Sequence, residues 1–391
     1  MNARVKSSEF GQKIKKYFHD ELNRYIFFTI VIFVFVITLL AWQSDDAYHA
    51  YVMAKNLVLG NGFAYNIGER ASASSCPLFT LIIAFGYFFI RKMFVVSLLI
   101  CIIFSTLAYR ILVRSFCKTK NQVILSFIIL LGSFCFISYT TSGLENSLLF
   151  FLAALFLKYY LSSELYTTKK LLVLAILISL IAMTRMDAVL LFIPMVLSAF
   201  LLKRDQVSFI RAVVIGFLGL LPFICWILFS LFYFGFPFPN TAYVKLGTDI
   251  PMVEYLYRGI QYVCISGIKD IVLLLIPAFF IFVATKSKKS KYICIALGLL
   301  MYGIYIIRIG GDFMVGRHFT VMFFIALCAV MEMMDRREIQ EHSKVKKVFV
   351  TLAVLGVLWN LTTDAISSQF LFGNNFNSPI ADERAGYFKY T

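Results

Sequence analysis

The chain has 391 residues, of which 60% are hydrophobic and only 15% are charged, and its formal net charge is +16. An ordinary soluble domain has about 45–50% apolar and about 25% charged residues. This composition excludes an ordinary soluble domain, and continuous apolar runs near the ~20 residues that cross a bilayer predict a polytopic all-α membrane protein. The absence of a period-two alternation argues against a transmembrane β-barrel.

The first apolar run, from Ile26 to Trp42, follows a basic N-terminal segment, residues 1–25. The positive-inside rule therefore places the N-terminus in the cytoplasm. Because the basic loops farther along the chain fall on the same side, orientation explains the net charge and no nucleic-acid partner is required. Further spans are predicted near 94–109, 121–139, 146–162, 171–184, 188–202, 212–234, 270–285, 292–307, 318–334 and 348–362.

The topology is ambiguous at residues 78–109, where two apolar pieces are separated by Arg91 and Lys92. This stretch is too long for one straight span and too short for three. We expect Leu78–Ile90 to be re-entrant or interfacial, which gives 11 spans with the N-terminus inside and the C-terminus outside. The alternative is two full spans with one exception to the positive-inside rule. A membrane domain is thus expected over 26–362, followed by a short external tail, 363–391.

The first external loop, 43–77, predicts a short amphipathic helix on the membrane surface. Ser44 is a good N-cap residue, Ala47, Tyr51, Ala54 and Val58 recur at helical spacing, and Gly60 is a natural terminator. Asp45 and Asp46 would lie at the positive end of this helix. They are interpreted either as helix-capping residues or as a general base.

Charged residues also occur in four other external loops, two of them over 235–269 and 308–317. Ionisable groups at the ends of buried helices are costly, so a shared external polar cavity is predicted. Arg317 would suit a phosphate, whereas the glycine-rich loop before it could be a simple connector. Arg185 with Asp187 could be a structural ion pair, and Lys245 could reach the membrane interface. Cys76 and Cys264 both fall in external loops and could form a disulfide.

Several motifs in this order resemble those of GT-C glycosyltransferases, in particular the terminal arabinofuranosyltransferase family of mycobacteria and its bacterial relatives. The motifs are Asp45-Asp46-Ala47-Tyr48, Gly60-Asn61-Gly62, Ser142-Gly143-Leu144-Glu145, Thr184-Arg185-Met186-Asp187, Pro239-Asn240-Thr241-Ala242-Tyr243 and Gly310-Gly311-Asp312-Phe313. The resemblance implies inverting transfer of a sugar from a polyprenyl phosphate at the outer face of the bacterial cytoplasmic membrane.

The resemblance also assigns roles to residues. Asp45 or Asp46, with Asp45 as first choice, would be the general base. Cations would stabilise the leaving phosphate: Arg317 first, then Arg185, Lys245, Arg70 and His318. Sugar hydroxyls would be oriented by Glu145, Asp187, Asn240, Tyr243 and Asp312. No cofactor is needed, because the donor is already activated, although the aspartates leave room for a divalent cation such as Mg²⁺ or Mn²⁺.

The sequence departs from the mycobacterial family in two ways that bear on its expected function. The tail is too short for the external carbohydrate-binding domain of the mycobacterial proteins. The Phe-, Ile-, Lys- and Asn-rich composition favours an AT-rich genome, and hence a hexose such as glucose on undecaprenyl phosphate, transferred to a surface glycan such as O-antigen or to a lipid-linked saccharide. The competing hypotheses are a transporter or flippase of lipid-linked sugars and a non-catalytic assembly subunit.

Overall fold

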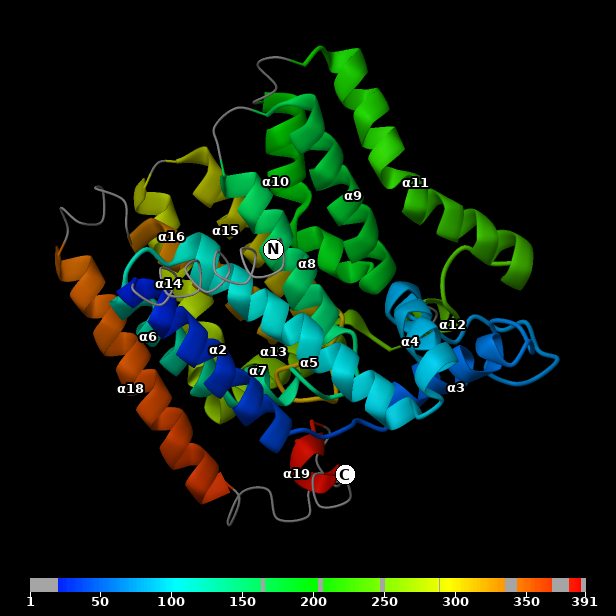
Figure 1. The fold of residues 1–391 in the computed structure, drawn as a ribbon, viewed down its shortest axis with the longest axis horizontal. Coiled ribbons are helices and arrows are strands. Elements are labelled where there is room, and N and C mark those ends of the chain that lie inside the picture. The colour runs from blue at the N-terminus through cyan, green and yellow to red at the C-terminus, as the bar shows by residue number, and fades with distance from the viewer. Residues whose placement is uncertain are drawn as a thin grey trace, which may run out of the picture.

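In the described parts of the chain, every named element is a helix (Figure 1), and the extended pairing there is a single bridge between Met314 and Ala381. The computed structural model describes residues 20–162, 166–202, 207–246, 250–287, 289–334, 343–367 and 380–387. Residues 1–19 of the basic N-terminal segment and 368–379 of the tail lie outside the described residues. The all-helical class predicted from the sequence is confirmed for these ranges.

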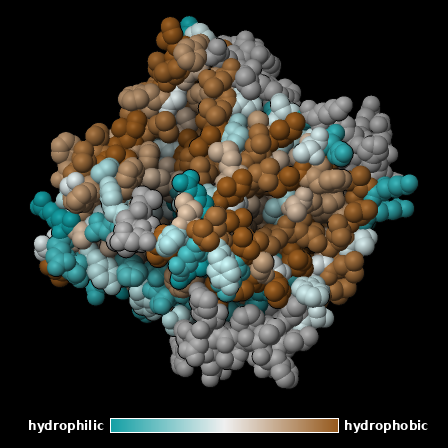
Figure 2. Space-filling view, turned by 180° about the vertical axis from the view of Figure 1, so that it is seen from behind, coloured by the Kyte–Doolittle hydropathy of each residue, from teal (hydrophilic) through white to brown (hydrophobic). Residues whose placement is uncertain are grey.

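Five described helices are long and apolar enough to cross a membrane. They are α2 (Glu21–Leu39), α5 (Met93–Ile111, extended by a π-turn to Phe116), α11 (Phe209–Phe234), α15 (Ser290–Arg308) and α18 (Ser343–Ser367). A sixth candidate is the pair α13 (Met252–Lys269) and α14 (Ile271–Ser287), which is bent by 106°. The chain therefore has the character of a membrane protein, and Figure 2 shows broad hydrophobic patches over one face.

Other expected spans are helical but shorter or interrupted. Helices α4 (Pro77–Ile90), α8 (Asn146–Leu161), α9 (Thr168–Thr184) and α16 (Phe319–Met334) have 14 to 17 residues. The expected span 121–139 is broken between α6 (Lys120–Leu131) and α7 (Phe134–Ser138), and 188–202 is divided into η2 (Asp187–Leu191), α10 (Ile193–Leu197) and η3 (Ser198–Leu202). Sequence hydropathy cannot detect such breaks, because the side chains stay apolar across them.

Helix α4 explains the ambiguity at residues 78–109. Its 14 residues span about 21 Å, less than the ~30 Å hydrocarbon core. The helix ends at Ile90, and the C-cap residue Arg91, with a left-handed φ of 57°, turns the chain directly into α5. The structure therefore divides this stretch into one short apolar helix and one helix, Met93–Phe116, that is long enough to cross a membrane.

Helix α16 forms the centre of the bundle. Nearly all its side chains are buried, and it packs against α8 and α14. By contrast, α11 and α18 lie at opposite edges in Figure 1 and expose many apolar side chains, as expected for helices that face lipid. The loop that precedes α16 is therefore anchored to the most enclosed element of the protein.

The break between α13 and α14 is held by a buried carboxylate. Asp270 accepts hydrogen bonds from the Ser133 hydroxyl at 2.7 Å, the Cys135 amide at 2.9 Å and the Asn360 side chain at 2.7 Å. It also accepts from the Leu273 amide at 3.2 Å, as an N-cap residue of α14 would. One side chain thus joins the bend to α7 and α18, a role that the sequence did not indicate.

The predicted helix in the first external loop is present as α3 (Ala47–Val58), which supports the helical spacing. Gly60 follows with a left-handed φ of 83°, as expected of a terminator. The prediction that Ser44 caps this helix is wrong. Asp46 occupies the N-cap position, and the Ser44 hydroxyl instead donates to Glu383 at 2.8 Å. A distant carboxylate competes successfully for that hydroxyl.

Candidate functional site

Four loops far apart in the sequence meet around one group of charged side chains. Asp46 comes directly before α3, Glu145 before α8, and Arg185 and Asp187 connect α9 to η2. The fourth loop joins α15 to α16. Together these loops form what we call the charged cluster: Asp46, Glu145, Arg185, Asp187, Asp312, Arg317 and His318.

Backbone hydrogen bonds explain why the first two loops meet. The Ser44 amide donates to the Ser142 carbonyl at 2.9 Å, and the Trp42 indole donates to the Ser138 carbonyl at 2.7 Å. Trp42 is almost fully buried. The end of the first apolar run is therefore fixed beside the loop that carries Glu145.

Glu145 is the centre of the charged cluster. Its carboxylate accepts from Arg317 Nη2 at 3.0 and 3.3 Å and from Arg185 Nη1 at 3.1 Å. Its side chain is 4% exposed, so this is a buried contact of two guanidinium groups with one carboxylate. Burial alone would raise the pKa of Glu145, but Arg317 and Arg185 together hold it below its usual value.

Arg185 is saturated by protein partners. Its Nε and Nη2 donate to the two oxygens of Asp187 at 2.9 and 2.8 Å, a bidentate pair, and its Nη2 also lies 3.2 Å from His318 Nδ1. The geometry fits the interpretation of Arg185 and Asp187 as a structural ion pair. Burial acts against ionisation of Asp187, but the Arg185 guanidinium outweighs it and lowers the pKa of that carboxyl.

His318 connects this pair to the glycine-rich loop. Its Nε2 lies 3.3 Å from Asp312 Oδ2, and its Nδ1 lies 3.2 Å from the Tyr302 hydroxyl. The pKa of Asp312 is low: burial opposes this, while His318 and then Arg317 favour the carboxylate. His318 is buried, and both of its ring nitrogens face protein groups. It is therefore better placed to orient Asp312 than to contact a phosphate.

Arg317 is the least saturated cation of the cluster. Its Nη1 lies 3.7 Å from both Asp46 Oδ2 and Asp312 Oδ2, longer than a good charge-assisted hydrogen bond, and 3.3 Å from the Met314 sulfur. Its buried Nε has no hydrogen-bond partner among the described atoms. Burial would lower the pKa of Arg317, but Glu145 and Asp312 raise it, so the guanidinium stays charged.

The charged cluster carries more negative than positive side chains, and helix ends help to balance them. Four carboxylates face two guanidinium groups. Helices α3, α8 and α16 begin at Ala47, Asn146 and Phe319, each within two residues of a cluster member. The positive ends of three helix dipoles therefore stabilise negative charge in this region.

The glycine-rich loop permits a close backbone approach. Gly311 has a φ of 76°, and a Cβ atom there would collide with the ring of Tyr262. The Tyr262 hydroxyl donates to the Met314 carbonyl at 3.1 Å and accepts from the His318 amide at 3.4 Å. The loop is thus held by packing and hydrogen bonds, which favours a positioning role over that of a flexible connector.

The two adjacent aspartates have different surroundings. Asp46 Oδ2 faces Arg317, whereas Asp45 Oδ2 accepts from the Tyr387 hydroxyl at 3.0 Å and its Oδ1 accepts from the Asp46 amide at 2.6 Å. Burial raises the pKa of Asp46, Arg317 opposes the shift, and Asp45 and Asp312 add to it. The structure thus brings Asp46, and not the first-choice Asp45, into the charged cluster.

The remaining predicted site residues lie elsewhere. Arg70 is exposed, with its guanidinium 5.2 Å from the Tyr233 ring centre. The Asn240 amide donates to the Ser72 carbonyl at 2.9 Å, and Tyr243 is exposed beside Phe236 and Phe238. The Lys245 side chain lies outside the described residues.

The disulfide predicted between Cys76 and Cys264 is wrong. Cys76 and Cys264 are both free, the first buried and the second exposed. A buried Cys76 thiol lies against the Ser74 hydroxyl at 3.9 Å and the Thr80 hydroxyl at 4.0 Å. Two cysteines predicted to lie in loops on the same side of the membrane need not have their Cα atoms close enough for a disulfide bond.

Sequence reasoning missed the contribution of the C-terminal segment. Glu383, buried in α19 (Glu383–Tyr387), accepts from Ser44, and Tyr387 donates to Asp45. Burial raises the pKa of Glu383 to about 7, with Asp45 and Asp46 adding to the shift against the Ser44 hydrogen bond. The only signal in the sequence is a charged group, Asp382-Glu383-Arg384, that follows the uncharged stretch 365–381.

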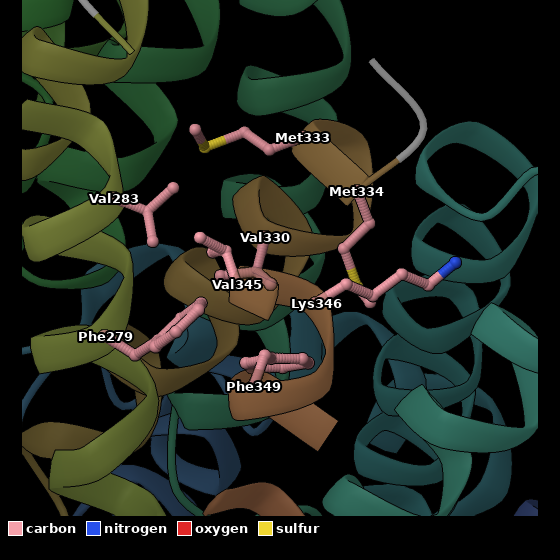
Figure 3. A pocket seen from close by; sticks show the side chains of 8 residues that line it. All are labelled: Phe279, Val283, Val330, Met333, Met334, Val345, Lys346 and Phe349. Atoms are coloured by element: carbon pink, nitrogen blue, oxygen red, sulfur yellow. The ribbon is translucent and has the colours of Figure 1, made fainter. Parts of the chain in front are cut away.

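An apolar hollow lies away from the charged cluster, at the other end of α16. Figure 3 shows its lining side chains from α14, α16 and α18: Phe279, Val283, Val330, Met333, Met334, Val345, Lys346 and Phe349. About 20 Å of helix separates it from Arg317. Nothing in its lining suits a sugar or a phosphate except Lys346, so we do not assign it to the site.

Among the described residues, no group of three or more His, Cys, Asp or Glu side chains is arranged to hold a metal ion. Comparisons with protein-family models, curated proteins and solved structures gave no match. The fold and the charged cluster define an all-helical protein of membrane character with a buried polar centre formed by four loops.

Proposed function

We propose that this protein is an inverting glycosyltransferase of the GT-C type, which transfers a sugar from a polyprenyl phosphate to a hydroxyl of a cell-surface glycan. The observation that carries the proposal is the convergence of Asp46, Glu145 and Arg317 from three loops into one buried cluster. A buried charged cluster is costly to maintain, and such clusters concentrate at functional sites.

In the proposed reaction Asp46 is the general base. Its carboxylate accepts the proton of the acceptor hydroxyl as that oxygen attacks the anomeric carbon. The bond between this carbon and the phosphate oxygen breaks, and polyprenyl phosphate leaves with the bonding electron pair. A carboxyl whose pKa is raised by burial is better matched to proton transfer near neutral pH than an ordinary aspartate.

Arg317 would stabilise the leaving phosphate. Its Nη1 makes two long contacts with carboxylates and one hydrogen bond to the Met314 sulfur, a weak acceptor, so an oxygen of the phosphate can replace them at little cost. The nearby starts of α3, α8 and α16 favour the same negative charge. Arg185, Glu145, Asp187 and His318 then act mainly as the frame that orients Arg317 and Asp312, and not as substrate ligands.

The wider proposal keeps the eleven-span topology, with the N-terminus inside, the short tail outside and the cluster at the outer face of a bacterial cytoplasmic membrane. It also keeps glucose on undecaprenyl phosphate as the donor and O-antigen or another surface glycan as the acceptor. A carrier of ~55 carbons leaves the bilayer only at high cost, so a membrane-embedded site suits it.

The test uses the full chain in proteoliposomes with undecaprenyl phosphoglucose and a panel of lipid-linked and polysaccharide acceptors. Asp46→Asn should reduce transfer 10²- to 10⁴-fold, the usual contribution of a general base. Arg258 forms an exposed ion pair with Glu254, and Arg258→Gln is the matched surface control, which should leave the transfer rate unchanged. Unchanged transfer by Asp46→Asn, or movement of the intact donor across the bilayer without transfer, would refute the proposal.

Binding of undecaprenyl phosphate alone isolates the second role. Arg317→Gln should weaken its binding at least tenfold relative to Arg258→Gln, because a charge-assisted contact with the phosphate is lost. Equal affinities in the two variants would remove Arg317 from the phosphate site.

A further inference from the structure

Residues 380–387 return from the end of the chain to the first external loop. In Figure 1, α19 lies beside the end of α2, from which that loop begins. Ser44 Oγ donates to Glu383 Oε2 at 2.8 Å, and the Tyr387 hydroxyl donates to Asp45 Oδ2 at 3.0 Å. Two side chains of one short helix thus contact two successive residues of the loop.

The same segment is attached to the glycine-rich loop by its backbone. The Ala381 amide donates to the Phe313 carbonyl at 2.6 Å, and the Val315 amide donates to the Ala381 carbonyl at 3.1 Å. These are the paired bonds of a short parallel bridge at Met314. The segment therefore spans the two loops that carry Asp46 and Arg317.

A buried ion pair anchors the segment at a third point. Lys269 Nζ lies 3.1 Å from Asp382 Oδ2, and both side chains are less than a tenth exposed. Lys269 and Arg384 also lie over the ring of Phe134, at 4.6 and 5.5 Å from its centre. Loss of either partner would leave a buried charge without its counter-charge, so this contact ties the segment firmly to the end of α13.

We propose that residues 380–387 act as a clamp in which Glu383 and Tyr387 are positioning residues: they hold Ser44 and Asp45 so that Asp46 faces Arg317. The clamp rests on the proposed function for its catalytic consequence, but its geometry stands apart from it. It assigns different roles to the adjacent aspartates, with Asp45 as the point of attachment and Asp46 as the base.

The geometry is tested without substrate. Ser44→Cys and Glu383→Cys are introduced together into the full chain, in which the two exposed cysteines, Cys225 and Cys264, have been replaced by serine. A short bifunctional thiol-reactive reagent, such as a bis-methanethiosulfonate, applied to membranes should link residues 44 and 383 in most molecules. If the protein folds and no link forms, the clamp is wrong whatever reaction the protein catalyses.

The positioning role is tested by transfer from undecaprenyl phosphoglucose. Tyr387→Phe removes one hydroxyl and should lower kcat about tenfold while KM for the donor stays unchanged, because a hydrogen bond to a charged acceptor is lost away from the phosphate. Tyr257→Phe, on an exposed face of α13, is the matched control. In an Asp45→Ala background, Tyr387→Phe should cost nothing more, and additive losses would contradict the proposal.

Glu383 gives the second discriminating pair. Glu383→Gln keeps an oxygen that accepts from Ser44 and should retain most activity, whereas Glu383→Ala should lose about tenfold. Equal losses in both variants would mean that the Glu383 charge itself takes part in the chemistry, which overturns a purely positioning role. If no variant and no wild-type sample transfers sugar while the 44–383 link forms, the clamp survives and the proposed function fails.

Discussion

Removal of the Glu145 charge should destabilise the protein substantially. Glu145→Gln takes away the carboxylate that two buried guanidinium groups share, through contacts of 3.0, 3.1 and 3.3 Å. Breaking a buried ion pair by removing one partner costs about 3–5 kcal/mol. Arg185 keeps its bidentate pair with Asp187, and Arg317 keeps two long contacts, so we expect the low end, about 3 kcal/mol.

This magnitude converts to a measurable shift in Tm. For 391 residues the unfolding entropy is about 0.8 kcal/mol/K, so 3 kcal/mol corresponds to about 4 °C. The assay is thermal unfolding of the detergent-solubilised protein. Glu254→Gln, in an exposed pair with Arg258, is the matched control and should shift Tm by about 1 °C or less. Equal shifts in the two variants would refute a central role for Glu145.

Three further outcomes are expected. The pKa of Glu383 is raised to about 7, so the folded state binds more protons than the unfolded state, and stability falls as pH rises from about 4.5 to 7. Glu383→Gln should remove about 1–3 kcal/mol of this loss. Parallel curves of Tm against pH for the variant and the wild type between pH 5 and 8 would contradict this expectation. Asp270→Ala should lower stability by about 3 kcal/mol or more, because it leaves several buried donors without their acceptor. An unchanged Tm would show that water replaces the carboxylate. Gly298→Ala should cost about 1–3 kcal/mol through a collision with the Leu191 backbone, while Gly303→Ala, which meets only an ordinary contact, should be neutral in the same melting assay.

Periodicity and hydropathy predicted the helices well where one physical rule dominates. The apolar runs of α2, α11 and α15 and the amphipathic helix α3 follow from composition and helical spacing alone. The interruptions could not be predicted in the same way. The break at Gly132 depends on Asn360, whose side chain donates to the Gly132 carbonyl at 2.7 Å from a helix more than 200 residues away.

The candidate site also has a part that the sequence predicts and a part that it does not. Ionisable residues at helix ends are unusual enough in an apolar chain to be noticed, and Asp46, Glu145, Arg185, Asp187, Asp312 and Arg317 do meet. Their individual roles depend on distances that a sequence does not contain. Of the two adjacent aspartates it is Asp46 whose side chain faces Arg317, which the sequence alone does not show. Glu383 has no recurring pattern around it, so only the folded chain reveals its contact with Ser44.

The helix starts that surround the charged cluster have a consequence for how this centre can change over time. Side chains such as Arg317 can be exchanged by single substitutions, but the partial charges of main-chain amides cannot. Part of the stabilisation of negative charge in the charged cluster is therefore fixed by the path of the chain, at the beginnings of α3, α8 and α16. Substitutions that change the side chains of the charged cluster would leave this main-chain contribution in place.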